Sequence, residues 1–242
     1  MILANLTQAI REQNWFAVVV EFLIVIAGVV IGFQISQMAN VRSEQSRLNA
    51  ELVALSEEMT VNLDRLGYFL ERSRSYRDDM LELRSVISGQ RPEITQEELD
   101  QLLWSTVPIP AMEFSLSAYQ EVVALDEPPV VVPSEIRGLL NEWDDSVKVF
   151  QRTSVDALEN RDNYVLPYLL QSFSMTALAQ QSGAASAVPP SEFTNELEDV
   201  VGNRELENLV SLRLTFNFQD IYNAERVEAY TRRVIDSIAS EA

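Results

Sequence analysis

The sequence contains no cysteine and no histidine. These two absences exclude thiolate nucleophiles, disulfides, Cys/His zinc sites, imidazole general bases and the usual haem ligands. We therefore expect a protein that is not an enzyme and that holds no metal or cofactor. The missing thiols leave the compartment open, because a chain without them suits the cytoplasm and the periplasm equally.

Signals for β-structure are also scarce. Only seven glycines are spread over 242 residues, and no strict alternation of apolar and polar residues runs far enough to indicate several strands. The composition therefore predicts an all-α protein. Its length allows one folded domain in addition to a membrane segment.

Positive charge is scarce in most of the chain. There are 18 basic and 37 acidic side chains, of which residues 1–40 hold only Arg11, Glu12 and Glu21. Residues 41–242 thus carry 17 basic and 35 acidic side chains, a formal charge of −18. Such a domain repels nucleic acid and anionic lipid headgroups, so the expected partners are proteins or cations.

One long apolar run is present, in residues 15–35. At about 1.5 Å per residue, its 21 residues match the hydrocarbon core of a bilayer, which is about 30 Å thick. A cleavable signal peptide has a shorter apolar region and a basic start, whereas only Arg11 precedes this run. We interpret it as an uncleaved transmembrane helix in membrane lipid, which leaves residues 36–242 as an acidic helical-bundle domain.

Residues 1–14 form a separate, interfacial segment in this interpretation, because its apolar residues share one helical face and suit a membrane surface. Basic residues do not decide the orientation, since Arg11 precedes the span and Arg42 and Arg47 follow it. A short start before an uncleaved span is typical of a signal anchor, which leaves the domain outside the cytoplasm.

Small and polar residues inside the span bear on function. Gly28-x-x-x-Gly32, with Ser36 one step further along the same face, lets two helix backbones approach closely, unless the motif is a chance occurrence. Glu21 is costly in hydrocarbon and indicates a proton or ion pathway, a contact with a neighbouring helix, or a carboxylate that snorkels to the headgroups. Gln34 lies near the opposite end and is predicted to be interfacial.

Spacings of three and four residues continue from the span into the domain without a break. This heptad seam predicts one helix, about 80 Å or more long, that ends near Ser88 at Gly89 and Pro92. From residue 48 onward ten of its twelve positions are apolar or aromatic, beginning with Leu48, Leu52, Leu55, Met59, Leu66 and Phe69.

The seam packs either against its copy in a coiled coil or against other helices of the same chain. Leu63 and Leu70 widen the apolar face and favour a bundle. The stretch nearest the membrane has polar seam residues, Gln34 and Gln45, and we expect it to contact another subunit.

Shorter helices are predicted after the long one. Thr95 and Glu98 have the spacing of a capping box, and Pro108 and Pro110 interrupt the helix that it starts. The helical pattern returns in residues 112–125.

The second half of the domain is predicted to be helical in two segments. Ser134 is the expected N-cap of a helix that reaches Pro167, which kinks or ends it. Residues 126–133 are predicted to be extended and residues 180–190 to be a flexible connection. The helical pattern returns from residue 196 to residue 240, and this last helix is expected to pack antiparallel to another long one. Its expected core is Leu206, Leu209, Phe216, Val227, Tyr230, Val234 and Ile238.

Two groups of side chains are candidates for a ligand site. The first group is four acidic pairs, whose carboxylates could bind calcium or magnesium: Glu57-Glu58, Asp78-Asp79, Glu97-Glu98 and Asp144-Asp145. Because neighbours in a helix point in different directions, we interpret these pairs as solvated helix faces. The second group either lines an apolar pocket between helices or packs in the core, which is the commoner role: Trp104, Trp143, Tyr164 and Tyr168.

Residues 13–18 (QNWFAV), 21–25 (EFLIV) and 28–36 (GVVIGFQIS) resemble a family of uncharacterised bacterial single-pass membrane proteins, which is classed only as a domain of unknown function. Residues 117–123 (SAYQEVV) and 134–140 (SEIRGLL) are similar to a helix, short turn and second helix of the same family. The resemblance implies a bacterial inner-membrane protein with its domain in the periplasm. It implies no catalytic residues.

Three functions are compatible with these patterns. The first is a non-enzymatic accessory or scaffold protein that forms a homo-oligomer or joins a larger membrane-protein complex. The second is a periplasmic ligand sensor of the helical-bundle type, which signals through a partner because only residues 1–14 precede the span. The third is an ion- or proton-coupled channel component that uses Glu21.

Overall fold

The computed structural model describes residues 15–125, 132–180 and 189–241, and within these residues all regular structure is helical. The all-α prediction is confirmed. In chain order the elements are α2 (Trp15–Ile87), α3 (Gln96–Trp104), α4 (Ser117–Ala124), α5 (Ser134–Asn160), the π-helical η1 (Arg161–Val165), α6 (Leu166–Ser172), α7 (Met175–Gln180), the 3₁₀-helical η2 (Leu197–Asp199) and α8 (Arg204–Glu241).

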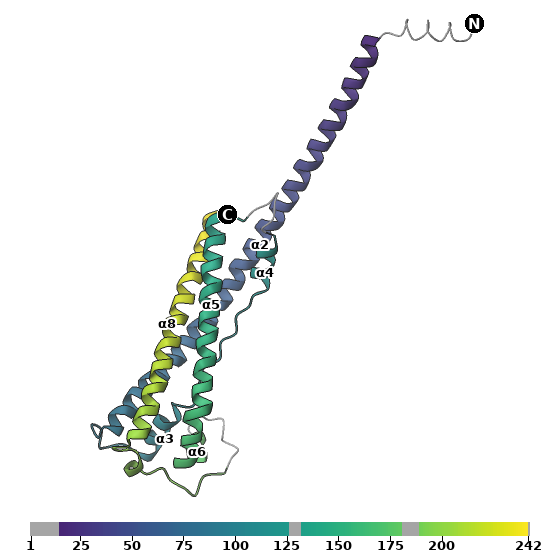
Figure 1. Cartoon of the computed structure of the whole chain (residues 1–242). Helices are drawn as coiled ribbons and strands as arrows, with labels where there is room; N and C mark the ends of the chain where they lie inside the picture. The colour runs from purple at the N-terminus through teal and green to yellow at the C-terminus, as the bar shows by residue number, and fades with distance from the viewer. Residues whose placement is uncertain (1–14, 126–131, 181–188, 242) are drawn as a thin grey trace, which may run out of the picture.

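Helix α2 is continuous over 73 residues, about 110 Å. It ends where the sequence predicted, because Gly89 has a φ of 74° and adopts the left-handed conformation that glycine accepts at no steric cost. The Gln90 N–H then donates to the Ser85 carbonyl, which is the hydrogen bond of a Schellman motif. All side chains of residues 18–47 are exposed, and Leu48 is the first buried one. The N-terminal part of α2 therefore projects from the bundle (Figure 1).

The bundle consists mainly of α2, α5 and α8. Helix α8 runs antiparallel to α2 and brings the C-terminus to the end of the bundle where α2 leaves it, while α5 runs in the same direction as α2 (Figure 1). The predicted seam residues are all buried against these helices: Leu48, Leu52, Leu55, Met59, Leu66 and Phe69. This part of the seam packs within the chain, as the wide apolar face indicated.

The apolar core is divided into two clusters along the bundle. The cluster nearer the projecting helix contains Trp143, which is fully buried, and Phe69 and Phe150, whose rings meet edge to face with centroids 5.1 Å apart. Trp143 donates its indole N–H to the Thr231 hydroxyl over 2.9 Å, which satisfies a polar group that would be costly to bury alone. The second cluster lies at the far end and includes Met80 and Leu206.

Thr231→Val is expected to lower the free energy of unfolding by about 2 kcal/mol, because valine keeps the shape but leaves the indole N–H of Trp143 buried without an acceptor. Chemical denaturation followed by tryptophan fluorescence measures the loss. Thr215→Val is the matched control, because Thr215 lies exposed on α8 and its hydroxyl makes the same bond to the carbonyl four residues before it. Equal effects of the two substitutions would contradict the assignment.

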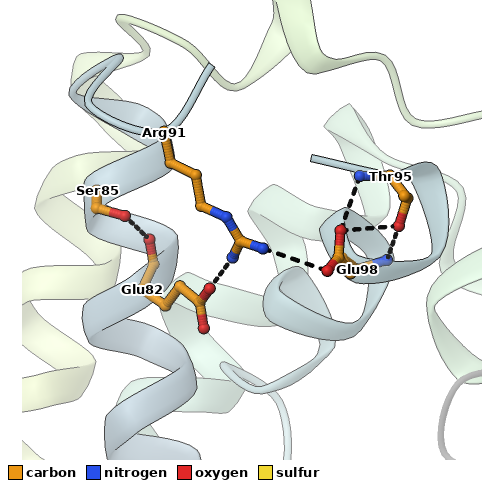
Figure 2. Close-up of polar contacts among 5 residues, drawn as sticks. All are labelled: Glu82, Ser85, Arg91, Thr95 and Glu98. Carbon is orange, nitrogen blue, oxygen red and sulfur yellow. Dashed lines mark hydrogen bonds and ion pairs between the residues drawn. The ribbon is translucent and has the colours of Figure 1, made fainter. Parts of the chain in front are cut away.

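The connection from α2 to α3 is held by polar contacts (Figure 2). Thr95 caps α3, and its backbone N–H donates to the Glu98 carboxylate over 2.9 Å, so the predicted capping box is confirmed. These bonds to Thr95 are the main reason that the pKa of Glu98 is lowered. Arg91 forms ion pairs with both Glu82 of α2 and Glu98 of α3, and thus joins the two helices.

Two predicted helix boundaries were wrong. Residues 112–116 are not helical, and α4 begins at Ser117. Helix α5 begins at Ser134 with Pro133 as its N-cap, so Ser134 is the first helical residue rather than the cap.

Pro167 was correctly predicted to disturb its helix, but the disturbance begins six residues earlier, in the π-helical turn η1. The Leu166 N–H donates to the Arg161 carbonyl, five residues back instead of four. Proline lacks an N–H and its ring crowds the preceding turn, and a wider turn relieves that crowding without ending the helix.

The C-terminal helix also starts later than predicted, because η2 and a turn at Gly202 precede Arg204. Gly202 has a φ of 73° and donates its N–H to the Ile87 carbonyl over 2.8 Å. Of the predicted core residues Leu206, Val227, Val234 and Ile238 are buried, whereas Leu209, Phe216 and Tyr230 are half-buried. The predictions for residues 1–14, 126–131 and 181–188 fall outside the described residues.

Candidate functional site

The projecting part of α2 contains the residues that the sequence singled out. An 18-residue window in it has a mean hydropathy of 2.6, and none of that window is buried, so the helix is long and apolar enough to cross a membrane. A Cβ added to Gly28 or Gly32 would meet nothing within 4 Å. Ser36, Glu21 and Gln34 are also exposed, so none of the five has a packing partner in the described chain.

The small residues continue beyond Ser36. Because α2 is unbroken at 3.6 residues per turn, spacings of three and four keep a residue on the same face. That face carries Gly28, Gly32, Ser36, Ala39, Ser43, Ser46 and Ala50, which we call the small-residue stripe. The sequence interpretation stopped at Ser36, although the same spacing, counted further, would have found the other four.

The seam lies on a different side of the same helix. At about 100° per residue, the seam lies on average about 140° around the helix from the stripe. Its exposed positions include Ile31, Met38 and Val41. They are in phase with the buried positions that follow, from Leu48 onward. The small-residue stripe therefore faces away from the bundle that the seam packs against.

The two polar residues of the apolar segment lie on different faces. Glu21 is two turns before Gly28 and shares the face of the stripe, whereas Gln34 belongs to the seam. Helix geometry thus brings Glu21 together with the small residues and separates Gln34 from them.

The sequence interpretation missed a second polar arrangement, centred on Glu58. Glu58 is only 8% exposed, and its carboxylate accepts four hydrogen bonds of 2.9–3.0 Å, from the hydroxyls of Ser115 and Ser117 and from the backbone N–H groups of Ala118 and Tyr119. Helix α4 has no side-chain cap of its own. Glu58 therefore caps α4 from another helix, which corrects the prediction that this acidic side chain is solvated.

Two neighbours of Glu58 on α2 hold the segment that leads into α4. The Asn62 amide donates to the Ser115 carbonyl and accepts from the Ser115 N–H, both over 2.9 Å. Arg65 donates to the Glu113 carbonyl over 2.9 Å. We call Glu58, Asn62 and Arg65 the polar clamp. It holds the non-helical backbone of residues 112–116 against α2 through the Glu113 carbonyl and the N–H and carbonyl of Ser115.

The pKa of Glu58 reflects the same geometry. Burial alone would raise it, but the bonds from Ala118, Tyr119 and the two serines outweigh burial and hold the pKa below its ordinary value of 4.5. The carboxylate is thus kept charged at the N-terminus of α4, where the helix dipole also favours a negative charge.

The proposed aromatic pocket is not assembled. Trp143 lies in the cluster nearer the projecting helix, whereas Trp104 and Tyr168 pack on the other cluster and Tyr164 is 60% exposed. Among the described residues no group of three or more acidic side chains is placed to hold a metal ion.

No family model, no curated protein and no solved structure matches the chain.

Proposed function

We propose that the chain is a non-enzymatic, membrane-anchored accessory or scaffold protein of a bacterial inner-membrane assembly. Residues 15–35 cross the membrane once, residues 36–242 lie in the periplasm, and the protein forms a homo-oligomer through the small-residue stripe. The observation that carries the proposal is a single helix that packs its bundle on one side and exposes an unbroken row of small residues on the other.

The composition of the stripe supports close helix pairing. Residues without bulky side chains let two backbones approach, so that van der Waals contact and weak Cα–H···O bonds accumulate along the pair. From Gly28 to Ala50 the stripe is about 33 Å long, which covers part of the membrane and the exposed segment before the bundle. An interface of this kind has parallel helices in register, as expected for two copies anchored in one membrane.

The direction of the stripe also supports pairing of two copies. Each bundle packs on the seam side of its own α2, about 140° from the stripe. Two helices that meet stripe to stripe therefore carry their bundles on the outer sides, where the acidic domains do not collide. The exposed seam positions, including Met38 and Val41, stay free for a different subunit of a larger complex.

Pairing through the small-residue stripe also suggests what Glu21 does. Since it shares the face of the stripe, two copies place their Glu21 side chains near each other inside the bilayer. A carboxyl group there forms a hydrogen bond across the helix pair, the kind of contact by which polar residues strengthen helix association in lipid. This assigns Glu21 to an interhelical contact rather than to an ion pathway.

Cysteine scanning tests the proposed interface, because the natural chain contains no cysteine. We expect Ser36→Cys, Ala39→Cys and Ser43→Cys to form disulfide-linked dimers under mild oxidation in native membranes. Neighbouring helices in register place these positions on each other, within the Cα separation of about 6 Å that a disulfide requires.

Met38→Cys and Val41→Cys are the matched controls, because they lie at the same depth on the seam face. They should remain monomeric or cross-link to another protein. Equal cross-linking at all five positions would indicate random collision and would contradict the interface. If every cysteine variant stays monomeric, and native mass spectrometry in mild detergent gives the mass of a monomer, the proposed oligomer is wrong.

A further inference from the structure

A buried polar layer separates the two apolar clusters of the bundle. On α8 it contains Arg213, Asn217, Asp220 and Asn223, each 3–6% exposed, and α5 adds Thr153 and Asn160. Two buried apolar residues of α8 between these positions belong to different clusters, Leu214 to the far one and Ile221 to the near one. The polar layer therefore interrupts the apolar core between the two clusters.

Several hydrogen bonds tie the layer to its surroundings. The Asn217 amide donates to the Ser73 carbonyl of α2 over 3.0 Å, and the Asn223 amide donates to the Thr153 hydroxyl of α5 over 3.1 Å. Arg213 donates its Nε–H to the Thr106 carbonyl over 3.1 Å. These bonds hold the layer in a fixed arrangement.

Three buried acceptors of the layer have no donor. The side-chain oxygens Oδ1 of Asn160, Asn217 and Asp220 are buried and have no hydrogen-bond partner. An unsatisfied buried acceptor costs about 1–3 kcal/mol, so three of them in one layer require an explanation. All three are acceptors, and a bound anion would not satisfy them.

The layer also adjoins the least regular part of the long helices. Asn160 is the last residue of α5, directly before the π-helical turn η1, and η1 contacts α8. Wide helical turns of this type often mark functional positions. A change in the layer is thus placed to act on the π-helical turn between α5 and α6.

We infer that the polar layer is a proton-binding site, in which a proton taken up from solvent by Asp220 supplies the missing O–H donor and tightens the contact of α8 with α5 and η1. Loss of that proton leaves a buried carboxylate that draws water into the layer and loosens the contact. The inference does not depend on the proposed oligomer.

The charges around Asp220 are consistent with proton uptake near neutral pH. Burial raises its pKa to about 6, against the positive charge of Arg213 and a bond from Thr153, and the charge of Asp156 on α5 raises it further. Arg161 of η1 acts on Arg213, whose pKa burial lowers to about 10. Among the described ionisable side chains of α2 none acts on Asp220.

The raised pKa of Asp220 determines how the stability of the fold depends on pH. The pKa of Asp220 is higher in the folded protein than its ordinary value of 3.8, so the folded state binds the proton more tightly than the unfolded state. The stability that this group contributes is complete below the ordinary pKa and is lost as the pH rises through about 6.

Hydrogen exchange on the full-length protein in mild detergent tests the inference. Between about pH 5 and about pH 7.5, we expect protection of the amides in η1 and in residues 213–223 to fall about tenfold after correction for intrinsic exchange. Asp220→Asn should abolish this dependence. Asp236→Asn is the matched control on an exposed position of α8 and should keep it.

The variant Asp156→Asn distinguishes proton binding by Asp220 from a purely structural role of that residue. It leaves the buried core unchanged. Asp156 is exposed, and its removal in Asp156→Asn should lower the pKa of Asp220 and move the midpoint of the exchange transition to lower pH. A wild-type protein whose corrected protection is constant over this range would overturn the inference. So would a midpoint that Asp156→Asn leaves unchanged.

Discussion

Glu58→Ala is expected to lower the free energy of unfolding by about 4 kcal/mol. The substitution removes the acceptor of four hydrogen bonds, and it leaves the N–H groups of Ala118 and Tyr119 at the start of α4 without a partner. Since α4 contributes Val122 and the ring of Tyr119 to the core around Trp143, its release also exposes one side of that core. Chemical denaturation measures the loss of stability, and near-ultraviolet circular dichroism of the aromatic side chains measures the loosening of the core.

Glu57→Ala is the matched control for this prediction. Glu57 precedes Glu58 on the same helix, but its side chain is exposed, so the same substitution should change stability by less than about 0.5 kcal/mol. A similar loss in both variants would indicate that helix α2 itself, and not the polar clamp, responds to the change.

The polar clamp and the polar layer give the protein opposite responses to pH. The pKa of Glu58 is lowered, so its contribution is present above about 4.5 and is lost as the pH falls through its folded value. The contribution of Asp220 is lost as the pH rises through about 6. Together they favour a stability maximum in mildly acidic solution, between these two transitions.

Helix α2 was predictable because its signals are local. Its seam repeats every three or four residues, and Gly89 marks its end, so periodicity and one glycine were sufficient. The same holds for the capping box of Thr95 and Glu98, whose partners are three residues apart. Patterns of this kind depend only on helix geometry, which the sequence carries directly.

The polar clamp was not predictable, because its partners are 48–61 residues apart and no local pattern joins them. The sequence showed Asn62 only as a polar exception in an apolar seam, and the structure explains that exception by its bonds to Ser115. The polar layer did leave a signal that was not used. Arg213, Asn217 and Asp220 occur at spacings of four and three, in phase with the apolar core positions of α8.

Gly28→Ile combined with Gly32→Ile is expected to abolish the proposed self-association in membranes, a weakening of at least about tenfold, or about 1.4 kcal/mol. The two glycines leave open space on the stripe. Branched side chains there would separate the backbones and remove the close contacts on which such helix pairs depend. Disulfide yield from Ser43→Cys, measured in the background of both exchanges, reports the loss outside the membrane segment.

Ala27→Ile provides the matched control, because it enlarges a small residue in the same turn of α2 but on the seam side. It should leave the Ser43→Cys disulfide unchanged. If Ala27→Ile abolishes the disulfide and the glycine exchanges do not, the copies meet through the seam, and Met38 and Val41 become the interface. Because the bundle packs on that same side, the two domains would then lie between the helices, so the control decides between two different assemblies.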